Sequence, residues 1–286
     1  MTVRKEILVF FLSVLAIVQL AVAQDNSAGD PLCTDTGIIT GQYRVFPAIN
    51  GNTGLVMIPT GRFPLDKEII FCIATNPARY HILPFKYKPV GEKLLSATFA
   101  FLPFMEITGT LVRPDNISKQ NPDSIDTRWG IGDRSLKMRI KLLNERKIFP
   151  SMVFGIHDFF SGNYHQSAVY IAGSKMIKPV TAITVDIHLG YGFNVSKPPF
   201  PDTPLFSNGD NLPVSFLNGV FGGVSIIYKT LVYNIEYDCH KVNAGFSLLL
   251  LNHLGLQVST LGFDRLSAGL SYRFIMGDPM IRKRLL

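Results

Sequence analysis

Residues Asp264–Phe274 read DRLSAGLSYRF, and this stretch decides the predicted fold. Every second residue in it is apolar or aromatic: Leu266, Ala268, Leu270, Tyr272 and Phe274. The residues between them are small or charged, and because successive side chains of a strand point to opposite faces, one face is apolar and the other polar. The two aromatic residues that end the apolar face favour a transmembrane barrel over a soluble sandwich, since membrane barrels carry aromatic girdles at the membrane surface.

The amino terminus has the organisation of a secretory signal peptide. Arg4 and Lys5 precede the apolar run Ile7–Val22, and Ala21-Val22-Ala23 forms a small-residue cleavage site. We therefore predict a signal peptide over 1–23, a mature chain that begins at Gln24, and export to the outer membrane. An uncleaved membrane anchor is the alternative. After this run, no apolar stretch reaches the roughly 20 residues that a membrane helix needs.

The composition agrees with an exported membrane barrel. Hydrophobic residues make up 47% of the chain and charged residues only 17%, below the usual quarter or so. The formal charge of +7 predicts acidic partners such as lipopolysaccharide or an anionic polysaccharide, while export argues against nucleic acid. Three cysteines and six histidines lack the spacing of a disulfide framework or a metal site, so we predict no metal, no cofactor and no catalytic site.

The alternation of the last segment recurs along the chain. We predict an all-β fold, a transmembrane antiparallel up-and-down β-barrel of about 12 strands, with 10–14 as the range. The candidate strands are Lys67–Asn76, Leu94–Leu102, Phe104–Arg113, Gly132–Leu143, Ser151–Phe159, Ser167–Met176, Val180–Tyr191, Gly219–Tyr228, Leu231–Asp238, Lys241–Leu250, Leu254–Thr260 and Asp264–Phe274.

The connections between these strands alternate in length. The long ones, Pro77–Lys93, Pro114–Ile131 and Gly192–Asn218, all fall at one end, as the external loops of membrane barrels do. A soluble β-sandwich, the alternative, would not require this sidedness. We divide the chain into a signal peptide (1–23), a periplasmic lead-in or plug segment (24–62), an outer-membrane barrel (63–274) and a periplasmic tail (275–286).

The polar face of each strand should line the barrel interior. The basic candidates are Lys137, Arg139, Lys141, Arg265 and Arg273, and the acidic ones are Glu106, Asp186, Glu236 and Asp238. Two interpretations remain open: a charged conduit or binding surface for a glycan, or opposite charges that pair and stabilise a filled barrel. Asp186 and His188 lie two apart on one strand, so both point inward, and an Asp–His pair suggests a less favoured enzyme hypothesis.

Three stretches carry a resemblance to a known family. They are Gly54–Ile69 (GLVMIPTGRFPLDKEI), Gly132–Gly155 (GDRSLKMRIKLLNERKIFPSMVFG) and Tyr237–Leu248 (YDCHKVNAGFSL). Together they resemble the YjbH-like outer-membrane proteins, which are associated with exopolysaccharide. Cys239 departs from the pattern, because it stands in a hairpin where glycine would be easier to accommodate. The family offers no catalytic residues to carry over to this chain.

The resemblance implies an outer-membrane β-barrel that supports export or assembly of extracellular polysaccharide. Its expected partners are outer-membrane lipid and lipopolysaccharide, an anionic polysaccharide, and periplasmic or outer-membrane export proteins. The alternatives are a passive porin-like or structural barrel, and a barrel enzyme that uses Asp186 and His188.

Overall fold

The computed structural model describes residues 45–80, 82, 90–115, 133–158, 166–180, 183–195 and 217–276. The predicted signal peptide, the lead-in up to residue 44, the centre (196–216) of the predicted connection Gly192–Asn218 and the tail from residue 277 lie outside the described residues. Within the described ranges, no helix is long and apolar enough to cross a membrane.

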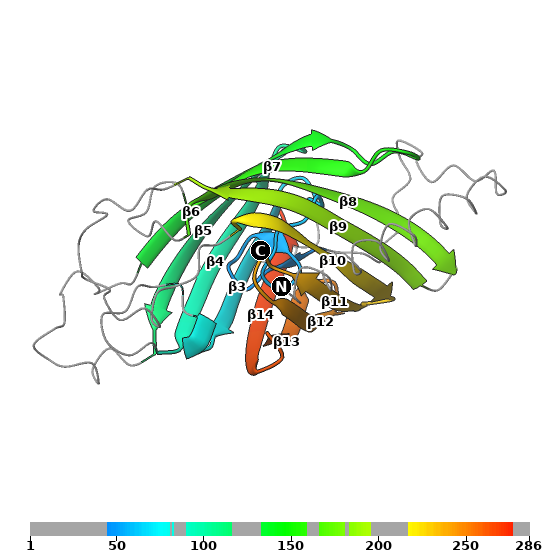
Figure 1. Ribbon diagram of the computed structural model, residues 1–286. Helices are drawn as coiled ribbons and strands as arrows, with labels where there is room; N and C mark the ends of the chain where they lie inside the picture. Colours follow the sequence, from blue (N-terminus) through cyan, green and yellow to red (C-terminus); the bar gives the residue numbers. More distant parts are fainter. Residues whose placement is uncertain are drawn as a thin grey trace, which may run out of the picture.

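Twelve antiparallel strands form a closed barrel (Figure 1), which confirms the predicted fold. Each strand pairs with its neighbours in the chain, and β14 pairs with β3 to close the circle. The strands are β3 (Glu68–Asn76), β4 (Glu92–Phe101), β5 (Met105–Pro114), β6 (Asp133–Leu143), β7 (Ser151–His157), β8 (Ala168–Val180), β9 (Ile183–Asn194), β10 (Gly219–Tyr228), β11 (Leu231–Tyr237), β12 (Val242–Leu250), β13 (Leu254–Leu261) and β14 (Arg265–Ile275). One 3₁₀ turn, η2 (Ala78–Tyr80), follows β3.

Apolar side chains cover the outer surface of the barrel. On β14, Leu270 and Tyr272 are 45% and 50% exposed, whereas Ser271 and Arg273 between them are buried. An apolar outer face of this kind is what lipid contact requires. Tyr272 lies beside Phe274, which stacks on Phe71 of β3 with ring centroids 6.3 Å apart, so aromatic rings meet where the barrel closes.

The connections divide the barrel into two ends. The links β3–β4, β5–β6, β7–β8 and β9–β10 lie at what we call the long-loop end, together with the tight turns β11–β12 and β13–β14. The other links are short turns at the opposite end, which we call the short-turn end. Cys239, in the β11–β12 turn, has a φ of 77°, a conformation that glycine adopts more easily. This geometry agrees with the expectation drawn from the sequence.

The first described residues lie inside the barrel. Strands β1 (Phe46–Pro47) and β2 (Thr53–Gly54) pair with each other and form a small separate sheet. We call Val45–Arg62 the inner segment (blue in Figure 1). Ile49 and Val56 pack against the interior side of β3, β4 and β5, and Leu55 and Ile58 pack against β8 and β10. The core is therefore formed by the inner segment and the barrel wall together.

Candidate functional site: the barrel interior

Arg139 and Glu106 form a buried ion pair on the barrel wall. The register of β5 and β6 places them directly opposite each other, and Arg139 Nη1 lies 2.9 Å from Glu106 Oε2. The same guanidinium donates to the carbonyl oxygens of Thr53, Thr60 and Arg62. Glu106 in turn accepts from the Thr53 hydroxyl at 2.8 Å. The pair thus joins two adjacent strands and also binds the inner segment.

Glu236 on β11 binds the backbone of the inner segment. Its carboxylate accepts from three consecutive amides: Val56 N at 2.9 Å, Met57 N at 2.7 Å and Ile58 N at 3.3 Å. Asn243 Nδ2 on β12 completes the set at 3.0 Å. Four hydrogen bonds to one buried side chain make Glu236 a principal attachment point for the inner segment. Its acceptor capacity is occupied by the chain itself.

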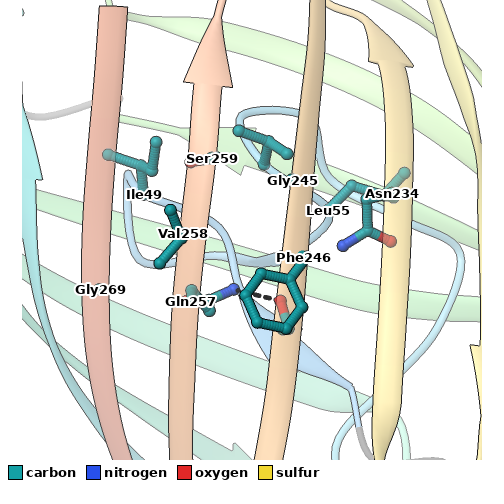
Figure 2. Close-up of a pocket in the computed structure, with 11 residues that line it drawn as sticks. Ile49, Leu55, Asn234, Gly245, Phe246, Gln257, Val258, Ser259 and Gly269 are labelled. Carbon is teal, nitrogen blue, oxygen red and sulfur yellow. Dashed lines mark hydrogen bonds between the residues drawn. The ribbon is translucent and has the colours of Figure 1, made fainter.

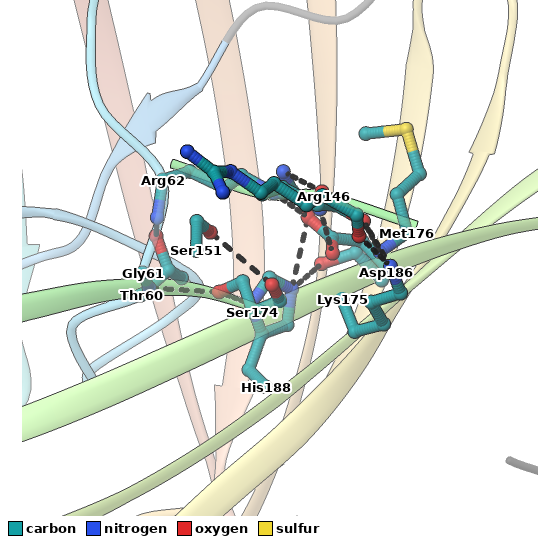
Figure 3. Close-up of polar contacts among 12 residues, drawn as sticks. Thr60, Gly61, Arg62, Arg146, Ser151, Ser174, Lys175, Met176, Asp186 and His188 are labelled. Atoms are coloured by element: carbon teal, nitrogen blue, oxygen red, sulfur yellow. Dashed lines mark hydrogen bonds and ion pairs between the residues drawn. The ribbon is translucent and has the colours of Figure 1, made fainter. Parts of the chain in front are cut away.

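Asp186 binds the last residue of the inner segment (Figure 3). Arg62 donates through Nε and Nη2 to the two carboxylate oxygens of Asp186, each at 2.7 Å, in a bidentate arrangement. Arg62 also pairs with Glu145 in the β6–β7 turn. The Ser174 hydroxyl on β8 accepts from Gly61 N at 2.7 Å. This end of the inner segment is therefore held by β8, β9 and a turn at the short-turn end.

His188 is enclosed by side chains of the wall. Ser174 Oγ lies 2.7 Å from His188 Nδ1, Ser225 Oγ lies 3.2 Å from Nε2, and Asp186 Oδ2 lies 3.7 Å from Nε2. The residue types of a hydrolase triad are present. However, His188 and Asp186 are 3% and 0% exposed, and both are in use as structural partners. The enzyme hypothesis finds no support in this arrangement.

The remaining predicted interior residues differ in placement. Lys137 is buried and donates to the Asn50 carbonyl oxygen and to Thr110 Oγ1. Arg273 is also buried; its Nη1 lies 3.7 Å from Glu68 Oε1.

Two predicted interior residues lie near strand ends. Lys141 is half-buried over the Phe63 ring, near the end of β6. Arg265 is exposed at the start of β14. Whether any of these residues takes part in function stays a prediction.

The inner segment packs closely against the wall on the side of β11–β14. Between Ile49, Leu55 and Val56 and the wall strands β11–β14 lies a cavity of only about 10 Å³ (Figure 2). A space of that size holds at most about one water. Gly245 makes room for this contact, because a Cβ there would lie 2.8 Å from Val56 Cγ2.

Several residues that hold the inner segment were not predicted from the sequence. Arg62, Ser174 and Thr53 have no recognisable motif around them. The one signal at Arg62 is its position, as a cation directly before a barrel whose polar faces contain carboxylates. Across the part of the chain that the structure describes, no group of three or more His, Cys, Asp or Glu side chains could hold a metal ion.

Residues 50–274 match the family model YjbH, described as exopolysaccharide biosynthesis protein YbjH. No curated protein sequence matches the chain. Among solved structures, a KdgM porin matches with a TM-score of 0.39 and 8% identity, over 72% of this chain and 98% of the porin. A bacterial polysaccharide outer membrane secretin matches with a TM-score of 0.35 and 10% identity, over 73% and 98%.

Proposed function

Because the chain belongs to the YjbH family of exopolysaccharide biosynthesis proteins and forms an outer-membrane β-barrel, we propose that it supports export or assembly of an extracellular polysaccharide. The observation that carries the proposal is the extent of the family match. It begins at Asn50, inside the inner segment, and ends at Phe274, in the last strand. The inner segment and the barrel therefore belong to one family unit.

The polar interior suggests how such a barrel works. The charged side chains that could line a conduit are bound to the inner segment through Arg139, Glu236 and Asp186. We propose that the barrel is closed at rest and that the inner segment must move if polymer passes through it. The same groups would then become available to the hydroxyl and charged groups of a glycan. If polymer passes elsewhere, the barrel serves as an assembly platform in the membrane.

The proposal includes the setting of the protein. The signal peptide 1–23 directs the chain across the inner membrane, the barrel lies among outer-membrane lipid and lipopolysaccharide, and export proteins approach it from the periplasm. Fractionation of cells followed by amino-terminal sequencing of the mature protein tests the first part. We expect an outer-membrane protein that begins at Gln24.

Deletion of the chain tests the biological role. We expect the deletion strain to lose surface polysaccharide under conditions in which the parent strain makes it, and expression of the full chain in trans to restore it. Unchanged polymer in the deletion strain would overturn the proposal. A His188→Ala variant that still folds, as heat-dependent gel mobility shows, is expected to restore the polymer as fully as the parent chain, since the proposal assigns no catalytic role to His188.

The alternative function is that of a passive porin, a channel without a role in polysaccharide export. It requires an open lumen, and residues Val45–Arg62 lie within the barrel and contact its wall. This observation favours the closed barrel. Conductance measurements separate the two, because a passive porin gives a steady current and a closed barrel gives little or none.

A further inference from the structure

A second polar cluster lies outside the interior, at the long-loop end of the barrel. It borders a cavity of about 430 Å³, which is formed by η2 and by the β11–β12 and β13–β14 turns. The residues that line it are Arg79, Tyr80, Lys241, Val242, Gly262, Phe263 and Asp264. The volume lies within the range of small-molecule sites, about 300–1,000 Å³. None of these residues is among the candidates drawn from the sequence.

Tyr80 organises this cavity. Its hydroxyl lies 2.9 Å from both the Leu261 carbonyl oxygen and Asp264 Oδ1, and accepts from Lys241 Nζ at 3.3 Å. The Lys241 ammonium also lies 4.4 Å from the centre of the Tyr80 ring. Gly262 permits this close approach, because a Cβ there would lie 2.2 Å from the Tyr80 hydroxyl. Three chain segments are thus fixed around one side chain.

Two cations, Arg79 and Lys241, and one carboxylate, Asp264, line the cavity. Arg79 pairs with Asp264, yet its side chain remains 61% exposed. The hydrogen bond with Tyr80, supported by the charges of Arg79 and Lys241, lowers the pKa of Asp264 below its usual value, so that one carboxylate faces two cations. Asp238, the other acid near this turn, accepts from the backbone amides of His240 and Lys241 and from the Asn243 side chain.

An exposed aromatic ring stands beside these charges. Phe263 is 65% exposed, and its φ of 58°, like the 57° of Gly262, is what the tight turn between β13 and β14 requires. The turn thus places an exposed apolar ring in the lining of the cavity. A flat apolar ring beside cations suits a sugar with an acidic group: the C–H face of the sugar packs on the ring, and its anion pairs with the guanidinium.

We propose that this cavity, which we call the rim pocket, binds a sugar that carries an anionic group. Arg79 and Lys241 bind the anion and Phe263 packs on the sugar ring. The inference rests on the proposed function, because it places a glycan site where polymer would leave the barrel. Two sources offer the same chemistry: a uronate in the exported polymer and a phosphorylated sugar of lipopolysaccharide.

Calorimetric titration of the mature full chain in detergent tests the rim pocket. The probes are an oligouronide, purified lipopolysaccharide and a neutral maltooligosaccharide. We expect saturable binding of the oligouronide and little binding of the neutral sugar. Saturable binding of lipopolysaccharide alone, with the variant pattern below, assigns the pocket to the membrane source. No saturable binding of either anionic probe, or equal binding of the neutral one, would overturn the proposal.

Matched variants locate the binding. Arg79→Gln, Lys241→Gln and Phe263→Ala should each weaken binding, the first two by about two- to fivefold, as exposed charge contacts do. Asp264→Asn should tighten it, because the competing carboxylate is removed while an acceptor for Tyr80 remains. Lys229→Gln, the same charge change at the short-turn end, is the control. Equal losses for Lys229→Gln and Arg79→Gln would show non-specific attraction and refute the pocket.

Two controls separate a loss of sugar binding from a loss of folding and from a failure of the proposed function. Each variant must retain heat-dependent gel mobility, which shows that the barrel is closed. Asp264→Asn, which predicts a gain, remains informative even if Arg79→Gln or Phe263→Ala folds poorly. The deletion strain tests the proposed function independently, so loss of surface polymer with no sugar binding would reject the rim pocket alone.

Discussion

Single side chains of the barrel wall hold the inner segment by hydrogen bonds to its backbone, and such bonds leave no pattern in the sequence. Glu236 is predicted to face inward from its alternation with Ile235 and Tyr237. Its partners, however, are the backbone amides of Val56, Met57 and Ile58, about 180 positions earlier in the chain. Backbone groups have no sequence signature, and so the inward direction was predictable while the contact was not.

Glu236→Gln tests this attachment. The substitution replaces one acceptor oxygen by an amide group that donates, so at least one of the three backbone amides loses its partner. We expect a loss of about 1–3 kcal/mol in the free energy of unfolding, the usual cost of an unsatisfied buried group. Urea unfolding in detergent measures it. Asp66→Asn, which removes a carboxylate from an exposed position, is the control. Equal stability of the two variants would contradict the role given to Glu236.

Arg139→Met tests the ion pair between β5 and β6. Removing the guanidinium leaves the Glu106 carboxylate buried without its cation, which typically costs about 3–5 kcal/mol. The double variant Arg139→Met/Glu106→Gln removes both charges and should lose less than the sum of the two single changes. Unfolding midpoints of all three variants form the double-mutant cycle. Strict additivity would show that the two side chains do not interact.

Among the elements, the presence of each strand was predictable from the sequence, whereas its boundaries were predictable only in part. All twelve predicted strands are present, because alternation between lipid and interior repeats every two residues regardless of distant contacts. Boundaries shifted most at β8, which runs four residues further than predicted, to Val180, and at β9, which lies three residues later at each end.

Whether a residue on the interior face of a strand is buried also depends on how far it lies from the end of the strand. Lys141 and Arg265 share the parity of buried residues but lie near strand ends, where water reaches them. Glu106 and Arg139 were both predicted to face the interior, and the structure places them directly opposite each other on β5 and β6. Alternation indicates a face but not a neighbour.

The tip of the inner segment offers a test at this scale. Gly51 has a φ of 93°, and a Cβ there would lie 2.5 Å from Ser96 Cβ, so Gly51→Ala is both strained and in steric conflict with β4. We expect the inner segment to loosen and to become accessible to protease while the barrel stays closed. Gly109→Ala on β5, where a Cβ would meet nothing within 4 Å, is the matched control. Equal protection in both variants would mean that the tip contact is unimportant.

At the scale of the whole molecule, closure and filling are separate properties. Pairing of β14 with β3 removes the free edges of the sheet, and the inner segment fills the space that this closure encloses. A closed circle of 12 strands lies between the filled barrels of about eight strands and the open porins of about 16. The barrel therefore has room for an additional chain segment, and the inner segment occupies that room.

This organisation predicts that the unaltered chain conducts little or no current. In planar bilayers the mature chain should give little or no steady current, because Val45–Arg62 lie inside the barrel and are bound to its wall. Deleting residues 45–62 should produce open channels, provided that the variant keeps heat-dependent mobility. If that deletion prevents folding, the double variant Arg62→Ala/Glu236→Gln, which removes two attachments, should give transient openings. Porin-like current from the unaltered chain would show that the inner segment does not block the barrel, and it would favour the passive-porin hypothesis. A deletion variant that folds but gives no current would show that something other than the inner segment closes the barrel.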